Sequence, residues 1–177
     1  FDNSMRVWLV RPIIFESQIL TEGYALNAAD WNDTHIVTAD ENSNIFIYDR
    51  HTGELLHQML DEDDSAGAFY MEIRNDGNNF VIAHSSCHVE LFNMDGEVLW
   101  ITRLEIGQTD LCRQVGFRPM ADEIVIMSDT TVIVLNGRTG DVIGTIPYTP
   151  ERPPLLRSFE FTADGQAILV GENYREQ

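Results

Sequence analysis

Short apolar runs alternate with turn residues along the whole chain. The runs are four to seven residues long, are rich in Val, Ile, Phe and Tyr, and are separated by Asp-Gly or Thr-Gly pairs. Within them, apolar residues recur at every second position, as at Ile45 and Ile47 and again at Val132 and Val134. This spacing predicts antiparallel strands joined by tight turns, because helices repeat their apolar positions every three to four residues.

The strand pattern recurs at a fixed period. Three segments align on their last turns, whose glycines are Gly53, Gly96 and Gly140. The steps between them are 43 and 44 residues, and each segment contains four strand-like runs. A period of this length with four strands is typical of one blade of a β-propeller, whose faces are buried only by neighbouring blades. We therefore expect three complete blades, over residues 24–60, 69–104 and 112–147.

Each end of the chain carries half of the same pattern. Residues 157–171 match the first two strands of a blade, and residues 4–20 match the last two. The predicted fold is thus all-β, a propeller of four-stranded antiparallel blades with three complete blades and two half-blades in a single domain, 1–177. Two arrangements stay open. The halves join within one chain to close a four-bladed ring, or the chain belongs to a larger ring, either as a stretch of a longer propeller cut through two blades or with its ring completed by another copy or chain. We favour the larger ring, which is less curved.

The turns carry a resemblance to a known family. Arg6-Val-Trp8, Phe46-Ile-Tyr-Asp-Arg-His-Thr-Gly-Glu-Leu-Leu56 and Leu91-Phe-Asn-Met-Asp-Gly-Glu-Val-Leu99 resemble WD-repeat propellers. The family's Trp-Asp pair stands here as Trp8-Leu9, Tyr48-Asp49, Phe92-Asn93 and Leu135-Asn136, and we expect Asp49 to cap its turn toward Thr52. Residues 136–147 are also similar to quinoprotein-like propellers. The resemblance implies a repeat-built scaffold for protein–protein interaction.

Charge restricts the choice of partners. The 177 residues contain 29 acidic and 11 basic side chains, all 11 of them Arg, so the formal net charge is -18. Such a chain repels nucleic-acid phosphates, and no apolar run is long enough for a membrane helix. We therefore expect neither nucleic acid nor membrane as partner. The Lys-free acidic composition fits either salt adaptation or an acidic binding module, and the sequence leaves both open.

Acidic side chains gather in the loops that would form one rim of the propeller. We expect this rim to bind a basic partner protein, with affinity that weakens as salt rises. The rim residues are Asp40, Glu41, Asp61, Glu62, Asp63, Asp64, Glu105, Asp110 and Asp129.

Two cysteines, and two histidines close to one of them, are the residues that could bind a metal or form a disulfide. Cys87 and Cys112 lie 25 positions apart, and we expect both to be small buried hydrophobes. His84, Cys87 and His88 include metal-binding residue types within five positions but have no distant ligand pair. They are weak metal candidates, so we predict neither a metal nor a cofactor, and we slightly favour an intracellular location.

No catalytic motif is visible. The sequence lacks Gly-x-Ser-x-Gly, a phosphate-binding glycine loop and His-Glu-x-x-His. We therefore expect a non-enzymatic interaction scaffold. One alternative is a cofactor-dependent, quinoprotein-like enzyme in which Arg113 and Gln114 face a central channel. Another is a structural segment of a large assembly.

Overall fold

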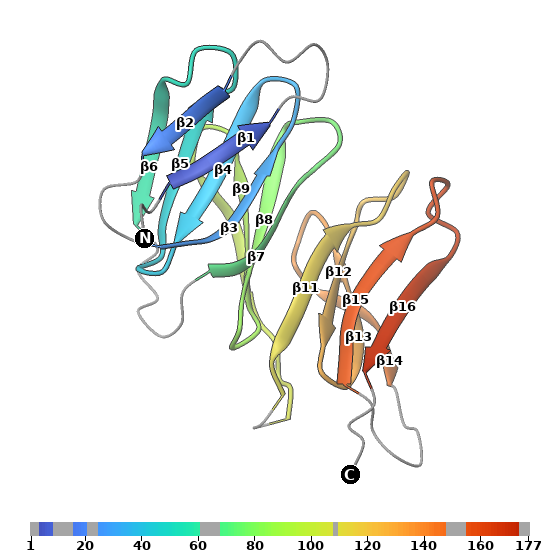
Figure 1. Ribbon diagram of the computed structural model, residues 1–177. Helices are drawn as coiled ribbons and strands as arrows, with labels where there is room; N and C mark the ends of the chain where they lie inside the picture. Colours follow the sequence, from blue (N-terminus) through green and yellow to red (C-terminus); the bar gives the residue numbers. More distant parts are fainter. Residues whose placement is uncertain are drawn as a thin grey trace.

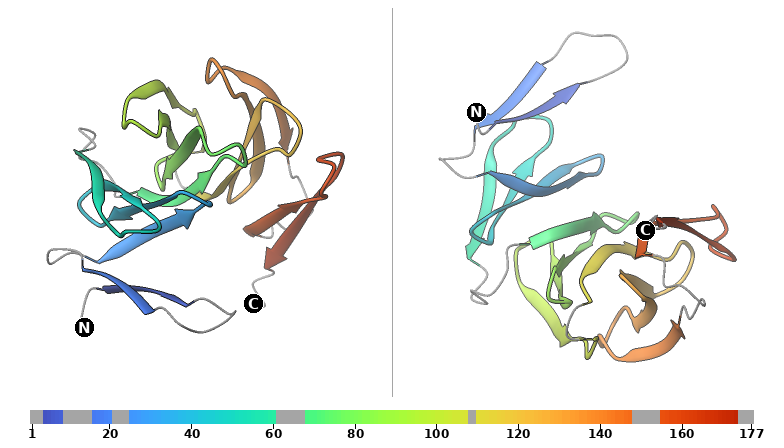
Figure 2. Two further views of the ribbon diagram at one scale, coloured as in Figure 1. Left: turned by 90° about the horizontal axis from the view of Figure 1, so that it is seen from above. Right: turned by 60° about the horizontal axis from the view of Figure 1, so that its bottom comes forward.

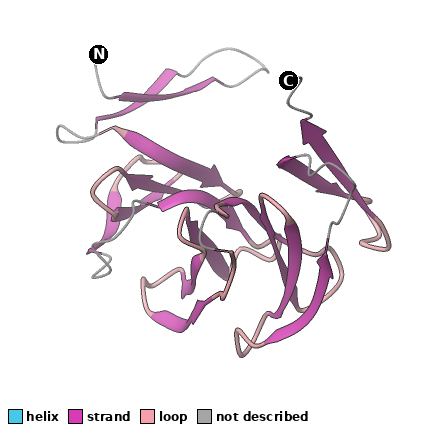
Figure 3. Ribbon diagram, turned by 90° about the horizontal axis from the view of Figure 1, so that it is seen from below, coloured by secondary structure: helices cyan, strands magenta, loops and turns pink. Residues whose placement is uncertain are grey.

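The protein consists of strands joined by turns and loops. The computed structural model describes residues 4–8, 16–20, 25–60, 68–107, 110–147 and 155–173, and no helix occurs among them (Figure 3). Accordingly, no helix of this described part has the length and apolar character needed to cross a membrane. The strands are β1 (Ser4–Trp8), β2 (Glu16–Leu20), β3 (Leu26–Trp31), β4 (His35–Asp40), β5 (Asn44–Asp49), β6 (Leu55–Leu60), β7 (Ala68–Ile73), β8 (Asn79–His84), β9 (His88–Asn93), β10 (Val98–Arg103), β11 (Cys112–Phe117), β12 (Glu123–Ser128), β13 (Thr131–Asn136), β14 (Val142–Pro147), β15 (Leu155–Phe161) and β16 (Ile168–Asn173).

The described strands form three four-stranded sheets and two hairpins. The first sheet is β3-β4-β5-β6, the second is β7-β8-β9-β10 and the third is β11-β12-β13-β14. Every pair is antiparallel, and neighbours in sequence are neighbours in each sheet. The N-terminal hairpin is β1–β2 and the C-terminal hairpin is β15–β16. The prediction of an all-β fold with four-stranded antiparallel units is therefore confirmed.

The strand registers repeat from sheet to sheet, irregularities included. Pairing shifts by one residue near the start of the first strand in each sheet and in the C-terminal hairpin: Leu26/Ala28, Ala68/Tyr70, Cys112/Gln114 and Leu156/Ser158. β-Bulges of this kind are kept where a strand must bend in a defined way. The shared bulge shows that the repeat extends to backbone geometry.

The turn between the third and fourth strands is built alike in all three sheets. Its first residue is Asp49, Asn93 or Asn136, and the side-chain oxygen accepts hydrogen bonds from backbone N–H groups two to four residues later. The predicted capping of Thr52 by Asp49 is confirmed, since the Thr52 N–H donates to Asp49 Oδ1 at 2.7 Å. The turn glycines all have φ between 73° and 83°, a conformation that glycine adopts without steric cost.

The sheets stand side by side along an open arc, with the two hairpins at its ends (Figures 1 and 2). Neighbouring sheets pack face to face and bury apolar side chains between them. Val37 and Ile45 of the first sheet meet Phe80 and Ile82 of the second in one core cluster. A second cluster joins the second and third sheets, and a third joins the third sheet to the C-terminal hairpin.

The two hairpins do not share a sheet. β1 pairs with β2 and β15 with β16, and among the described strands no hydrogen-bonded four-stranded unit joins the two hairpins. The N-terminal hairpin lies beside the first sheet, and the C-terminal hairpin lies beside the third (Figures 1 and 2). Of the two closures expected from the sequence, the one within a single chain is not formed by the strands that the structure describes.

Candidate functional site

Three residues of the expected acidic rim are held by internal contacts. Asp40 is 1% exposed, and its Oδ1 accepts hydrogen bonds from the backbone N–H groups of Asn42 and Asn44, both at 2.9 Å. Asp129 is 5% exposed and accepts two hydrogen bonds from the Arg113 guanidinium at 2.7 and 3.0 Å. Asp110 accepts one from Thr130 Oγ1 at 2.6 Å. These carboxylates stabilise turns and loops through the oxygens that accept these hydrogen bonds.

The other rim residues divide into two groups. Glu41 and Glu105 are exposed, as a rim surface requires. Residues 61–64 lie outside the described residues, so the run Asp61-Glu62-Asp63-Asp64 stays a prediction from the sequence. The described part of the rim therefore offers fewer free carboxylates than the sequence suggested.

Carboxylates instead join the first strands of neighbouring sheets. The Ile73 N–H of β7 donates to Asp30 Oδ2 of β3 at 2.6 Å, and the Phe117 N–H of β11 donates to Glu72 Oε1 of β7 at 3.2 Å. Gly116 leaves room for this contact, since a Cβ there would lie 2.7 Å from Glu72 Oε2. The sequence pattern does not reveal these links, because the partners are 43 and 45 residues apart.

Glu72 is the most perturbed of these carboxyl groups. Burial raises its pKa to about 7, against a smaller lowering by the Phe117 N–H, and the negative charges of Asp30 and Glu160 raise it further. A carboxyl group with this pKa is partly protonated at neutral pH. It therefore binds and releases protons in the physiological range.

The two residues expected to face a cofactor are also engaged elsewhere. Arg113 pairs with Asp129, and the hydrogen bonds from this pairing raise the pKa of the guanidinium. Gln114 joins the third sheet to the C-terminal hairpin, because its Oε1 accepts from the Phe159 N–H at 2.7 Å and its Nε2 donates to the Phe159 carbonyl at 3.0 Å. Both side chains are bound to other parts of the protein. They therefore provide no support for the alternative of a cofactor-dependent, quinoprotein-like enzyme.

Cys87 and Cys112 form a disulfide, with their Cα atoms 5.1 Å apart. The expectation of two free cysteines was wrong, although both residues are buried as expected. The backbone brings them together, since the Cys112 N–H donates to the Ser85 carbonyl and the Leu104 N–H to the Cys87 carbonyl, each at 3.1 Å. This crossing joins the β8–β9 turn to β11 and is a tertiary contact that sequence spacing does not reveal. Disulfide formation also removes Cys87 from the metal candidates, because only a thiolate binds a metal well.

The two histidines of the same turn lie together with a carboxylate. His84 ends β8 and His88 begins β9, and their ring centres are 5.2 Å apart. His88 Nε2 lies 3.3 Å from Glu90 Oε1. One ligand atom from each of the three residues lies within 4.8 Å of the others, and all three residues are buried. Both histidines were candidates from the sequence, whereas Glu90 was not. Glu90 lies two residues after His88 in β9, which puts both side chains on the same face of the sheet.

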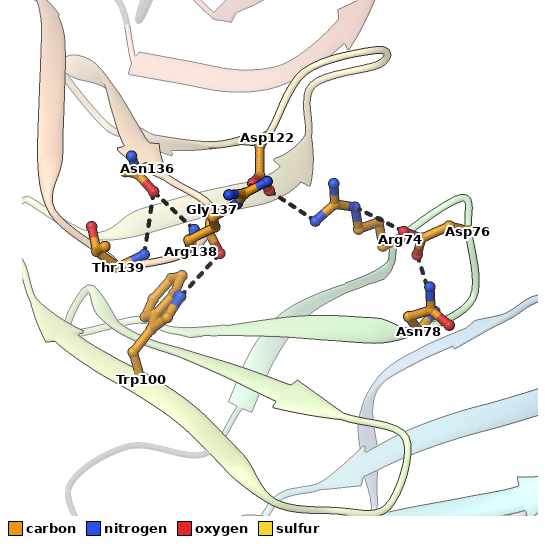
Figure 4. Close-up of polar contacts among 9 residues, drawn as sticks. All are labelled: Arg74, Asp76, Asn78, Trp100, Asp122, Asn136, Gly137, Arg138 and Thr139. Atoms are coloured by element: carbon orange, nitrogen blue, oxygen red, sulfur yellow. Dashed lines mark hydrogen bonds and ion pairs between the residues drawn. The ribbon is translucent and has the colours of Figure 1, made fainter.

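Arginine and aspartate side chains meet at the ends of the second and third sheets that lie away from the disulfide (Figure 4). Arg74 Nη1 lies 2.9 Å from Asp122 Oδ1, and Arg138 Nε lies 2.5 Å from Asp122 Oδ2. Burial of Asp122 acts to raise its pKa, but the hydrogen bonds from Arg138 and Arg74 outweigh it and lower the pKa. Asp122 thus remains ionised and links the two sheets.

A buried tryptophan strengthens the same junction. Trp100 Nε1 of β10 donates to the Gly137 carbonyl at 3.1 Å, and Thr102 Oγ1 donates to the Gly140 carbonyl at 2.8 Å. The last strand of the second sheet is thereby fixed to the turn of the third (Figure 4). Each such hydrogen bond stabilises the junction by about 1 kcal/mol.

An apolar pocket of about 200 Å³ opens between the third sheet and the C-terminal hairpin. Its apolar lining is Val125, Val132, Val134, Ile146, Phe161 and Ile168. Ile146 is 56% exposed, and beyond β16 no described strand continues the sheet of the hairpin. An apolar pocket beside an unpaired strand edge is a surface that another strand pair can cover.

Comparison with known proteins adds no family. No family model matches the chain, and no curated protein matches it. The resemblance to WD-repeat propellers therefore depends on the turn sequences and the repeat alone.

Proposed function

We propose that the protein is a non-enzymatic interaction scaffold of the WD-repeat-like propeller type, whose ring is completed by a second copy of the chain. The observation that carries this proposal is the apolar pocket beside the free edge of β16. β15 and β16 repeat the bulge found in the first two strands of every complete sheet. The third and fourth strands of a complete sheet would occupy the position of this pocket.

The N-terminal hairpin has the sequence pattern of those missing strands. Residues 4–8 repeat the third-strand pattern, with Trp8 in the place taken by Tyr48 and Phe92. Because the chain's own hairpin lies beside the first sheet, the hairpin that fills the pocket is taken from the second copy. Exchange at both ends gives a closed ring with two-fold symmetry.

The number of sheets supports exchange between two copies. Each copy has three complete sheets in its described part, so two copies contribute six, and the paired hairpins add two composite sheets. Eight is within the range of known propellers, whereas closure within one chain gives four, at the strongly curved limit. The ring presents its loops on two rims, where repeat scaffolds bind partner proteins.

The disulfide indicates the kind of cellular compartment in which such a scaffold functions. Disulfides persist in oxidising compartments and are rare in the cytosol. The Cys87–Cys112 bond therefore favours an oxidising environment over the intracellular one expected from the sequence.

Light scattering on matched variants tests the proposal. The wild-type chain is expected to show twice its mass of 20.1 kDa. Ile168→Asp places a charge in the pocket and should give a monomer, because a buried unpaired carboxylate is costly. Met120, in the turn after β11, is 94% exposed and does not line the pocket, so Met120→Asp should leave the dimer intact. A wild-type monomer, or equal behaviour of the two variants, would contradict closure by a second copy.

A further inference from the structure

The buried cluster of His84, His88 and Glu90 is not used by the proposed scaffold function and has the composition of a metal site. Imidazole and carboxylate are the nitrogen and oxygen ligands preferred by zinc and neighbouring divalent metals. The three side chains come from both sides of one tight turn, and each is at most 5% exposed. They are therefore ordered by the sheet and do not belong to a solvated loop.

The separations suit a tetrahedral ion. With metal–ligand bonds of about 2.0 to 2.1 Å, two ligand atoms at a tetrahedral angle lie about 3.3 Å apart. His88 Nε2 and Glu90 Oε1 are 3.3 Å apart. Two imidazoles bound to one such ion have ring centres about 5 Å apart, and the His84 and His88 rings are separated by 5.2 Å. All pairs are within 4.8 Å, so side-chain rotation has at most about 1.5 Å to close.

Comparison between the repeated sheets shows how unusual the cluster is. By register, Glu90 faces Ile82, and the corresponding residues of the other sheets are Phe46, facing Thr38, and Ile133, facing Ile126. Where the first and third sheets have an apolar side chain, the second has a carboxylate that is 3% exposed. A buried carboxylate is tolerated where protein groups such as the His88 imidazole, or a bound cation, compensate its charge.

At the turn positions of the two histidines, the first sheet has a different pair of polar residues. In the first sheet the corresponding turn positions hold Asp40 and Asn44, whose side chains are joined by a 2.7 Å hydrogen bond. In the second sheet His84 and His88 occupy those positions, and the turn between them is fixed by the Cys87–Cys112 disulfide. A fixed turn preorganises the two imidazoles, which lowers the cost of bringing ligands together.

From this geometry we infer that His84, His88 and Glu90 bind one first-row divalent metal ion, with Zn²⁺ the best fit, and a water molecule as fourth ligand. The site is structural: it is buried, and Glu90 is opposite Ile82, a member of the core cluster between the first and second sheets. The ion would stabilise that junction, as the disulfide stabilises the junction with the third sheet. This inference goes beyond the scaffold function and does not depend on how the ring closes.

Titration with Zn²⁺ and Co²⁺ tests the site on the full chain after treatment with a chelator. We expect one tightly bound Zn²⁺ per chain, the visible absorption of tetrahedral Co²⁺, and a rise of several degrees in the thermal midpoint on binding. His88→Gln should reduce Zn²⁺ affinity at least tenfold. His51→Gln, in an exposed turn, is the matched control and should bind as the wild type does.

A second variant keeps the test decisive if His88→Gln fails to fold. Glu90→Leu gives the second sheet an apolar residue where its repeats have Phe46 and Ile133, so it should fold, as far-ultraviolet circular dichroism will show. It should lose the Co²⁺ absorption and the thermal shift. If Glu90→Leu binds Zn²⁺ as tightly as His51→Gln does, or if the wild type gives no tetrahedral Co²⁺ spectrum, the metal site is rejected. The cluster is then an ion pair only.

Discussion

At the scale of single residues, Glu72 gives the clearest dependence on pH. Its pKa is raised to about 7 in the folded protein, whereas in an unfolded chain it is near 4.5. Between these values the folded state holds a proton that the unfolded state has released. Stability from this group is therefore fully present below about pH 4.5, falls as pH rises to about 7, and is constant above it.

Glu72→Gln removes this titration and keeps an acceptor for the Phe117 N–H. We expect the variant to lose the stability change between about pH 4.5 and 7, and to exceed the wild type by up to about 3 kcal/mol at pH 8. Urea unfolding across the pH range measures both. Glu54→Gln, at an exposed turn residue, is the control and should follow the wild type. Parallel pH profiles for Glu72→Gln and the wild type would show that Glu72 does not titrate in this window.

Single-residue roles followed from the sequence only where they depend on near neighbours. The cap that Asp49 provides to Thr52 was predictable, because donor and acceptor are three residues apart and turn chemistry is local. The burial of Asp129 against Arg113 was not, since it depends on how two loops fold over one another. An acidic residue in a loop is usually exposed, and this expectation fails where an arginine neutralises it.

At the scale of elements, the disulfide is the strongest local constraint. It closes a loop of 25 residues between the β8–β9 turn and β11. Closing a loop of this length stabilises the folded state by about 3 kcal/mol, mainly by restricting the unfolded chain.

We therefore expect Cys87→Ser/Cys112→Ser to lower the free energy of unfolding by about 3 kcal/mol, measured by urea denaturation. Serine suits the turn, because Ser43 has φ of 62° at the corresponding position of the first sheet and Cys87 has φ of 58°. Reduction of the wild type by dithiothreitol should give the same loss. Equal stability of reduced and oxidised protein would mean that the bond does not constrain folding.

Strand positions were predictable, whereas contacts between sheets were not. Alternating apolar residues and turn glycines mark each strand within its own repeat, so the three sheets matched the expected ranges closely. The disulfide, the Glu72–Phe117 bond and the addition of Glu90 to the histidine pair depend on register or on packing between repeats. Periodicity places residues on a face, but it does not reveal which distant side chain they meet.

At the scale of the whole molecule, the net charge of -18 is the dominant long-range term. Mutual repulsion among these charges destabilises the compact state, and salt screens it. We expect the thermal midpoint at pH 7.5 to rise between about 0.05 and 1 M NaCl, because the Debye length falls from more than 10 Å to about 3 Å. Near the isoelectric point of about 4.3 the same salt step should have little effect. A midpoint that falls with salt at pH 7.5 would indicate that surface ion pairs outweigh repulsion.

Ring closure depends both on the two terminal hairpins and on the shape of the whole assembly. The repeat in the sequence predicted that the two ends are complementary halves, and the described strands end in two separate hairpins. No rule of local sequence decides whether complementary halves meet within one chain or between two. That choice depends on the curvature of the arc, which the packing between sheets sets.

A crystal structure of the assembled protein tests this account most directly. The free edge of β16 is predicted to pair with residues 4–8 of a second copy, so that β15, β16 and the partner's hairpin form one four-stranded sheet that covers Val134 and Ile146 of the third sheet. An assembly in which the edge of β16 stays unpaired and the apolar pocket is open to solvent would contradict it.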